Sequence, residues 1–284
     1  MMKPMNCLCL FCVLLLSSAG AETKKYRHGK VSSLDARGVL VIVGGGTISS
    51  AMYSKMIELA GGRSARVFVI PQASAEDPKI KAAGYINEFK KARAASAAYY
   101  DPNRMNDNIK HIENADLIWL GGGTQQRLVE RLKDTKIPAL LRARYIEGCV
   151  IAGSSAGAAV MSKKMISGKS ALRAINGNST DITEGLGFLP HTFIDQHFHK
   201  RQRFNRLISA VLQYPAYVGI GIDESTGLHD FIYIRTPLKK DSPYFHRLSR
   251  KKCVTVLTLF FGTGLTSACE SVCSLAVGRS QSAN

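Results

Sequence analysis

Ser155 is the central residue of a G-x-S-x-G segment, Gly153-Ser154-Ser155-Ala156-Gly157, a pattern that is typical of a nucleophilic serine. The segment follows an apolar run of strand type, and Ala158–Met161 after it is compatible with a helix. A G-x-S-x-G turn between a strand and a helix lifts the serine hydroxyl above the sheet and aims the next backbone N–H at an oxyanion. We therefore predict that Ser155 is a nucleophile and that the amide of Ala156 is an oxyanion donor. The alternative is a small-residue turn without chemistry.

A second glycine-rich turn, Gly121-Gly122-Gly123, closes a different apolar run. Because ligands of open α/β folds bind at the carboxyl ends of the strands, this turn is expected near Ser155. The amides of Gly122 and Gly123 are candidates for the second oxyanion donor. Taken alone, the turn would be interpreted as a tight strand-to-helix connection.

A third element is the thirteen-residue string D-Q-H-F-H-K-R-Q-R-F-N-R-L, residues 195–207. Its strand-like start would deliver His197 to the same edge of the sheet as a general base for Ser155. Three arginines follow on an expected helix, and guanidinium groups suit the capture of carboxylates: Arg201, Arg203 and Arg206. The alternatives are a buried core histidine and a solvated arginine face. A metal site at His197 and His199 lacks a third ligand, so no metal is expected.

Short apolar runs that alternate with amphipathic segments must position these groups. Continuous apolar strands between helices are typical of a parallel sheet covered on both faces. We therefore predict the α/β class: a doubly wound, mostly parallel sheet with helices on both faces and the nucleophile turn at the carboxyl edge. The expected strands are 39–43, 66–70, 116–120, 148–152, 193–196 and 217–222, and the expected helices are 47–59, 77–98 and 125–132.

Four segments together resemble the cyanophycinase family. They are the G-S-S-A-G turn, G-G-T-Q-Q-R-L at 122–128, the His–Arg string, and G-I-G-I-D-E-S at 219–225. The resemblance covers about residues 39–227, and the His–Arg string is its most specific part. That family belongs to serine peptidases that include aspartyl dipeptidase, with a fold related to class I glutamine amidotransferases.

The resemblance implies hydrolysis next to an aspartyl residue through an acyl-enzyme, with Ser155 as nucleophile, His197 as base and no cofactor. The substrate would be an aspartyl-rich peptide or cyanophycin, a poly-aspartate carrying arginine on each β-carboxyl, and the product the β-Asp-Arg dipeptide. Aspartyl-dipeptidase specificity and a non-catalytic homologue that binds acidic peptides are the alternatives. The resemblance also places a set of residues in the substrate site: Gln125, Asp195, Gln196, Arg201, Arg203 and Arg206.

One departure concerns the acid that orients the histidine. The resemblance implies a glutamate about eighteen residues after the nucleophile, but Arg173 stands at that spacing. No residue between Ser155 and Thr180 is acidic. Asp181 and Glu184 are therefore the candidates for the third member of the triad.

The ends of the chain differ from its centre. Residues 1–21 combine Lys3, an apolar stretch and a small-x-small pattern, which predicts a signal peptide and a secreted or periplasmic protein. Residues 22–37 form an N-terminal extension, and residues 38–229 the catalytic domain. Residues 230–284 are an atypical tail that either completes the sheet or is aberrant, with a strand candidate at 254–261.

The chain is strongly basic, with 38 Lys and Arg against 21 Asp and Glu, a formal net charge of +17. This excess permits anionic partners without choosing among them. The lysine pairs are scattered and lack interleaved aromatic residues, so we expect neither nucleic acid nor, after removal of the signal peptide, a membrane as partner. A homodimer is left open.

Overall fold

The computed structural model describes residues 36–168 and 174–229 together with two short tail strands, β11 (Val256–Leu259) and β12 (Ser274–Leu275). The expected signal peptide and Arg173 lie outside the described residues, as does most of the tail. Within the described part of the chain, no helix combines the length and the apolar character that a membrane crossing requires.

The larger of two mostly parallel sheets carries the nucleophile turn. Its strand order is β10-β1-β5-β4-β2-β3, and every neighbouring pair is parallel except β1 with β10. The strands run over Leu40–Val43 (β1), Arg66–Ile70 (β2), Ser96–Tyr99 (β3), Leu117–Leu120 (β4), Val150–Ser154 (β5) and Gly227–Leu228 (β10).

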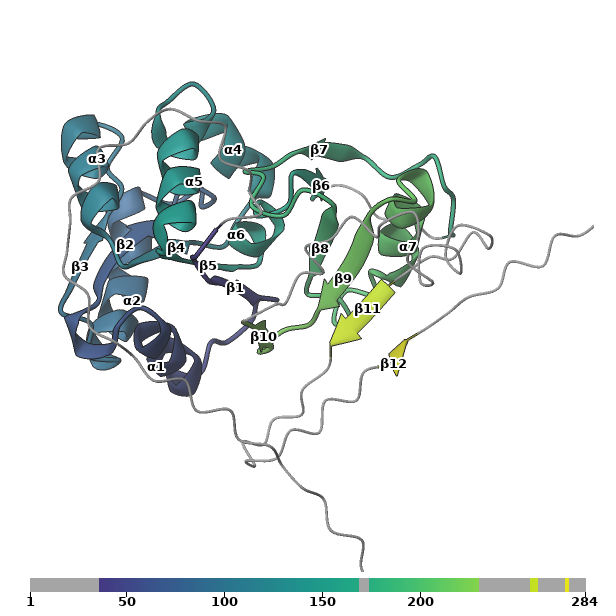
Figure 1. Ribbon diagram of the computed structural model, residues 1–284. Helices are drawn as coiled ribbons and strands as arrows, with labels where there is room; N and C mark the ends of the chain where they lie inside the picture. The colour runs from purple at the N-terminus through teal and green to yellow at the C-terminus, as the bar shows by residue number, and fades with distance from the viewer. Residues whose placement is uncertain (1–35, 169–173, 230–255, 260–273, 276–284) are drawn as a thin grey trace, which may run out of the picture. The chain divides into compact units, whose positions relative to one another are not determined.

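Helices cover both faces of this sheet, which explains why its strands are apolar without interruption. Val69 and Trp119 pack in one core with residues of α1 (Ser50–Leu59) and α2 (Pro78–Lys91). The alternate residues pack on the opposite face, which the next three helices cover (Figure 1). These helices are α3 (Met105–Asn114), α4 (Gln125–Leu132) and α5 (Ile137–Glu147).

The smaller sheet has the order β12-β11-β9-β8, with β8 (Thr192–Gln196) and β9 (Val218–Ile222) parallel. Helix α7 (Phe204–Gln213) packs Leu207 and Val211 into a core with Phe193 of β8. The remaining elements are short: η2 (Gly62–Ser64), α6 (Ala156–Ala159), and the antiparallel pair β6 (Lys164–Ile166) and β7 (Ile182–Glu184).

The predicted α/β class with a mostly parallel sheet is confirmed, with its strands divided between two hydrogen-bonded sheets. The predicted helix over 77–98 is wrong at its end, because α2 stops at Lys91 and Ser96–Tyr99 forms β3. Arg93 turns the chain with a φ of 69°, and the alanine-rich segment after it pairs with β2. Tertiary pairing here overrides the helix propensity of alanine. The strand candidate at 254–261 contains β11.

Candidate active site

Ser155 lies on the sharp turn that joins β5 to α6. Its φ is 53° and its ψ is −112°, a conformation that residues with a side chain rarely adopt. The backbone N–H of Ser155 donates to the Val43 carbonyl at 3.0 Å, which anchors the turn to β1. A Cβ on Gly157 would lie 2.0 Å from the Leu120 carbonyl oxygen, so only glycine allows α6 to pack against β4. The local sequence thus forms the strained strand-to-helix turn expected of a nucleophile.

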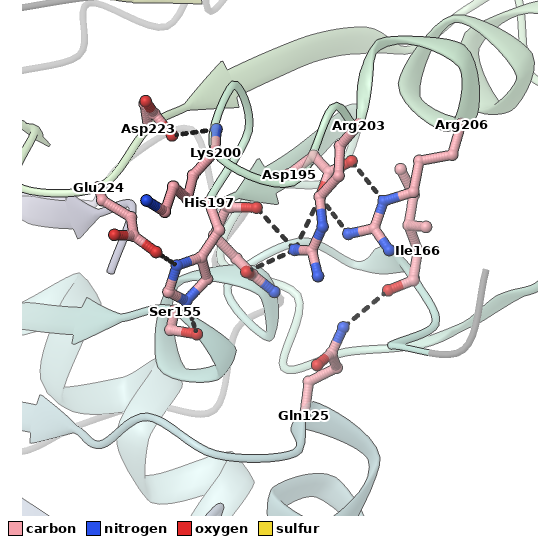
Figure 2. A network of polar contacts seen from close by, with 11 residues as sticks. Gln125, Ser155, Ile166, Asp195, His197, Lys200, Arg203, Arg206, Asp223 and Glu224 are labelled. Carbon is pink, nitrogen blue, oxygen red and sulfur yellow. Dashed lines mark hydrogen bonds and ion pairs between the residues drawn. The ribbon is translucent and has the colours of Figure 1, made fainter. Parts of the chain in front are cut away.

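His197 and Glu224 complete a chain of side-chain contacts that begins at Ser155 (Figure 2). Ser155 Oγ lies 2.9 Å from His197 Nε2, and His197 Nδ1 lies 2.6 Å from Glu224 Oε1. His197 follows β8 directly, and Glu224 follows the end of β9. With the Nδ1 proton donated to Glu224, the lone pair of Nε2 faces the serine hydroxyl. This arrangement is that of a serine–histidine–acid triad.

The expectation that Asp181 or Glu184 is the third member of the triad is therefore corrected, because Glu224 holds the imidazole. Glu184 is exposed on β7, where its Oε1 lies 3.3 Å from Lys164 Nζ. Asp181 is also exposed and directly precedes β7. The useful signal was the position of Glu224 after an apolar strand, since the carboxyl ends of parallel strands converge at one edge. Spacing along the chain from Ser155 did not contain that information.

The glycine turn after β1 was not predicted to be part of the site, yet it holds the histidine and its acid. His197 N–H donates to the Gly44 carbonyl at 2.8 Å, and Ser225 N–H donates to the Gly45 carbonyl at 2.8 Å. A Cβ on Gly45, whose φ is 117°, would lie 2.4 Å from His197 Cε1. The imidazole therefore packs directly on the Gly45 backbone, and a side chain there would displace it.

The second predicted oxyanion turn lies beside the nucleophile. A Cβ on Gly122 would be 3.6 Å from Ser155 Cβ, and the Gly122 N–H donates to the Tyr85 hydroxyl at 3.2 Å. Ala156, the other predicted donor, follows Ser155 as the first residue of α6. A cavity of about 400 Å³ opens over these groups, and both Gly122 and Gly123 line it together with Ser155. The oxyanion roles of Ala156, Gly122 and Gly123 remain predictions.

Four of the predicted substrate-site residues form a buried polar cluster beside the triad: Asp195, Gln196, Arg203 and Arg206. Figure 2 labels the three charged members. Arg206 makes a two-pronged ion pair with Asp195, with Nε 2.7 Å from Oδ2 and Nη2 bonded to Oδ1. Arg203 Nη1 donates to the backbone carbonyl and the side-chain Oε1 of Gln196, each at 2.6 Å. It also lies 3.5 Å from Asp195 Oδ1.

The expected row of three arginines on one helix is therefore wrong. Helix α7 begins at Phe204, so Arg201 and Arg203 lie in the turn before it. Arg203 and Arg206 are 9% and 4% exposed, whereas Arg201 is exposed. The buried pair satisfies acceptors inside the protein, as buried guanidinium groups must.

Gln125, the remaining predicted substrate-site residue, is also buried. It begins α4, and its Nε2 donates to the Ile166 carbonyl at 3.0 Å (Figure 2). This hydrogen bond fastens the end of β6 to α4. In the structure Gln125 therefore holds the backbone near the site, and its predicted role in the substrate site remains a prediction.

The electrostatics of the site keep the base neutral. Burial lowers the pKa of His197, the positive charges of Arg201 and Arg203 lower it further, and Glu224 opposes them. An imidazole that is neutral near pH 7 can accept the Ser155 proton. Burial lowers the pKa of Arg203 to about 10, and the charge of Arg206 adds to this effect. Two guanidinium groups against the single carboxylate of Asp195 leave the cluster with excess positive charge.

Comparison with known proteins places this geometry in a family. Residues 40–230 match peptidase family S51. The chain is 39% identical over 173 residues to a cyanophycinase from a Nostoc species, covering 59% of this chain and 58% of that protein. It is 33% identical over 202 residues to a cyanophycinase from Synechococcus elongatus, covering 67% of this chain and 62% of that protein. The chain thus spans less than two thirds of these relatives.

A solved structure shares the fold. It is a peptidase from an acI-B1 Actinobacterium, with a TM-score of 0.53 and 20% identity, covering 69% of this chain and 84% of the other. The family match covers about two thirds of the sequence and includes Ser155, His197 and Glu224. The chain belongs to peptidase family S51.

Proposed function

We propose that this protein is a serine peptidase that hydrolyses aspartyl peptide bonds of cyanophycin and releases β-Asp-Arg dipeptides. The observation that carries the proposal is the contact chain from Ser155 through His197 to Glu224, with distances of 2.9 and 2.6 Å. The first distance is short enough for proton transfer from Ser155 to His197, and the second is short enough for Glu224 to orient the imidazole.

The proposed reaction has two halves that use the same residues. Ser155 Oγ bonds to the scissile carbonyl carbon while its proton passes to His197 Nε2, and the carbonyl π electrons move to the oxygen. When this tetrahedral species collapses, the C–N bond breaks and the leaving amine takes the proton from His197. Water then repeats the sequence on the acyl-enzyme, releasing the acid and restoring Ser155. Glu224 accepts the Nδ1–H throughout and stabilises the imidazolium.

The substrate assignment is supported by charge and by similarity. Arg201 and Arg203 are close enough to His197 to lower its pKa, so the site favours an anionic chain. The relatives of 33–39% identity carry the name cyanophycinase.

The non-catalytic alternative depended on a missing triad acid and on the atypical tail, most of which lies outside the described residues. Because Glu224 contacts His197 Nδ1, the first argument no longer favours a binding protein over an enzyme. Aspartyl-dipeptidase activity uses the same catalytic residues, and the products of the reaction distinguish it.

Export is a further part of the proposal, supported by the sequence pattern of residues 1–21 alone. The expected location is the periplasm or the medium. N-terminal sequencing of protein recovered from those fractions should begin near Glu22. An intact Met1 in the recovered protein would contradict export by signal cleavage.

The experiment that tests the function compares the full-length protein with Ser155→Ala on purified cyanophycin and on aspartyl dipeptides. We expect β-Asp-Arg from cyanophycin with the wild type and none with the variant. Hydrolysis of dipeptides without release from the polymer would instead identify a dipeptidase. A folded wild type that binds cyanophycin and releases nothing would contradict catalysis.

A further inference from the structure

Tyr85 stands at the active-site cavity but belongs to none of the motifs considered above. It lies on α2, and its ring packs against the buried Trp119 with ring centroids 5.6 Å apart. The ring also borders the glycine turn after β4, because a Cβ on Gly121 would be 3.2 Å from Tyr85 Cε2. This packing fixes the ring, and Tyr85 and Ser155 both line the active-site cavity.

The Tyr85 hydroxyl and the nucleophile flank the same residue of the predicted oxyanion turn. A Cβ on Gly122 would be 3.9 Å from Tyr85 Oη and 3.6 Å from Ser155 Cβ. The Gly122 N–H is directed at the Tyr85 oxygen at 3.2 Å. A phenol that accepts one hydrogen bond still has its own proton to donate. The hydroxyl therefore has a proton to donate beside Gly122, which lines the cavity together with Ser155.

We propose that the Tyr85 hydroxyl is a further hydrogen-bond donor to the oxyanion that forms when Ser155 attacks the substrate carbonyl. This inference rests on the proposed function. The proton stays on Tyr85, and the bond strengthens as the carbonyl π electrons move onto the oxygen. The Gly122 N–H, which donates to Tyr85 Oη, polarises the phenol and makes it a better donor.

The surroundings of Tyr85 are preorganised for such a role. Asp77 caps α2 by accepting from Lys79 N–H at 2.8 Å and Ile80 N–H at 3.2 Å. The neighbouring cavity wall is also held, because Arg131 Nη1 donates to the Ser74 carbonyl at 2.9 Å. A donor already fixed in place stabilises developing charge without reorganisation at the moment of reaction.

The test compares Tyr85→Phe with Tyr99→Phe, a half-buried tyrosine on the edge strand β3. Tyr85→Phe keeps the packing on Trp119 and removes only the hydroxyl. We expect kcat for dipeptide release to fall about 100-fold in Tyr85→Phe, with KM and the thermal midpoint close to those of the wild type. Tyr99→Phe should match the wild type. An unchanged or increased kcat in Tyr85→Phe would overturn the proposal, and an increase would show that the hydroxyl blocks Gly122.

A second measurement does not need cyanophycin, so it separates this inference from the substrate assignment. Diisopropyl fluorophosphate places a P=O oxygen where an oxyanion would form, as the Ser155 Oγ–P bond forms and fluoride leaves. We expect its rate of modification of Ser155, followed by intact mass, to fall about 100-fold in Tyr85→Phe alone. Equal rates in wild type and Tyr85→Phe would overturn the role of Tyr85 even if the wild type cleaves the polymer.

Discussion

The two sheets contribute different chemistry to one site. The six-stranded sheet presents Ser155 after β5 and Gly122 after β4, on a core that is apolar on both faces. The four-stranded sheet presents His197 after β8 and Glu224 after β9, next to a buried ionic cluster. The nucleophile and the predicted oxyanion donors therefore come from one sheet. The base that transfers the proton and the acid that orients it come from the other.

Backbone hydrogen bonds of the glycine turn after β1 align the two contributions. His197 N–H donates to the Gly44 carbonyl, and Gly44 N–H donates to the Thr226 carbonyl at 3.0 Å. Ser225 N–H donates to the Gly45 carbonyl. Because these hydrogen bonds lie at the site itself, away from the shared apolar core, catalysis can be lost while both sheets stay folded.

The largest effect on rate is expected from the acid of the smaller sheet. Glu224→Gln keeps the size of the side chain but removes the charge that orients His197, so kcat should fall about 10³- to 10⁴-fold. Glu184→Gln is the matched control, and its kcat should equal that of the wild type. Dipeptide release measures both. Loss of activity in Glu184→Gln with full activity in Glu224→Gln would show that Glu184 on β7, and not Glu224, is the triad acid.

The largest effect on stability is expected from the buried arginine of the smaller sheet. Arg206→Met leaves Asp195 buried without its two-pronged partner, which should lower the free energy of unfolding by about 3–5 kcal/mol. Arg201→Gln changes an exposed side chain and should cost about 0.5 kcal/mol or less. Urea denaturation of the full chain compares them. Equal losses would contradict the division into buried and exposed arginines.

A smaller effect on rate is expected at the glycine turn after β1. Gly45→Ala and Gly62→Ala both place a Cβ at positive φ, which costs about 1–2 kcal/mol of stability in each. Only the Gly45 methyl meets the imidazole, since a Cβ on Gly62 has no atom within 4 Å. Displacement of His197 should lower kcat about 100-fold in Gly45→Ala alone. Similar kcat in both variants would show that the turn does not position the base.

The smallest effect is a shift in pH dependence. His197 must be neutral to act as base, and its pKa lies below the ordinary value of about 6.5, so the acid limb of kcat/KM should have its midpoint below pH 6.5. Arg201→Gln removes a positive charge that opposes protonation, so the midpoint should move to higher pH, less so in high salt. Arg63→Gln, on η2, serves as control. A shift to lower pH in Arg201→Gln would contradict the electrostatic account.

Much of this architecture could be predicted from the sequence, because strands of a parallel sheet that is buried on both faces have uninterrupted apolar sequences, such as 117–120 and 150–152. Ser155 and His197 were identifiable since each has a distinctive local sequence at a strand end. Glu224 lies in the segment 219–225 that the sequence analysis singled out, but its role was missed because the adjacency of β8 and β9 depends on strand order, which distance along the chain does not encode. β3 was missed because its alanines favour helix until β2 is available for pairing.

The arginines show the same limit in another form. Sequence spacing cannot tell whether a guanidinium faces solvent or an internal carboxylate, and the buried position of Arg206 depends on the packing of α7 against β8. Likewise, Tyr85 carries no local signal, because its hydroxyl reaches Gly122 only after α2 packs on the sheet.

The most direct test of the central claim is detection of the acyl-enzyme. The full-length protein would be mixed with cyanophycin, quenched in acid within the first turnovers, digested and analysed by mass spectrometry. The account predicts an aspartyl ester on the peptide that contains Ser155, and its absence in both Ser155→Ala and His197→Ala. Dipeptide release by Ser155→Ala, or an acyl group on a different residue, would contradict it.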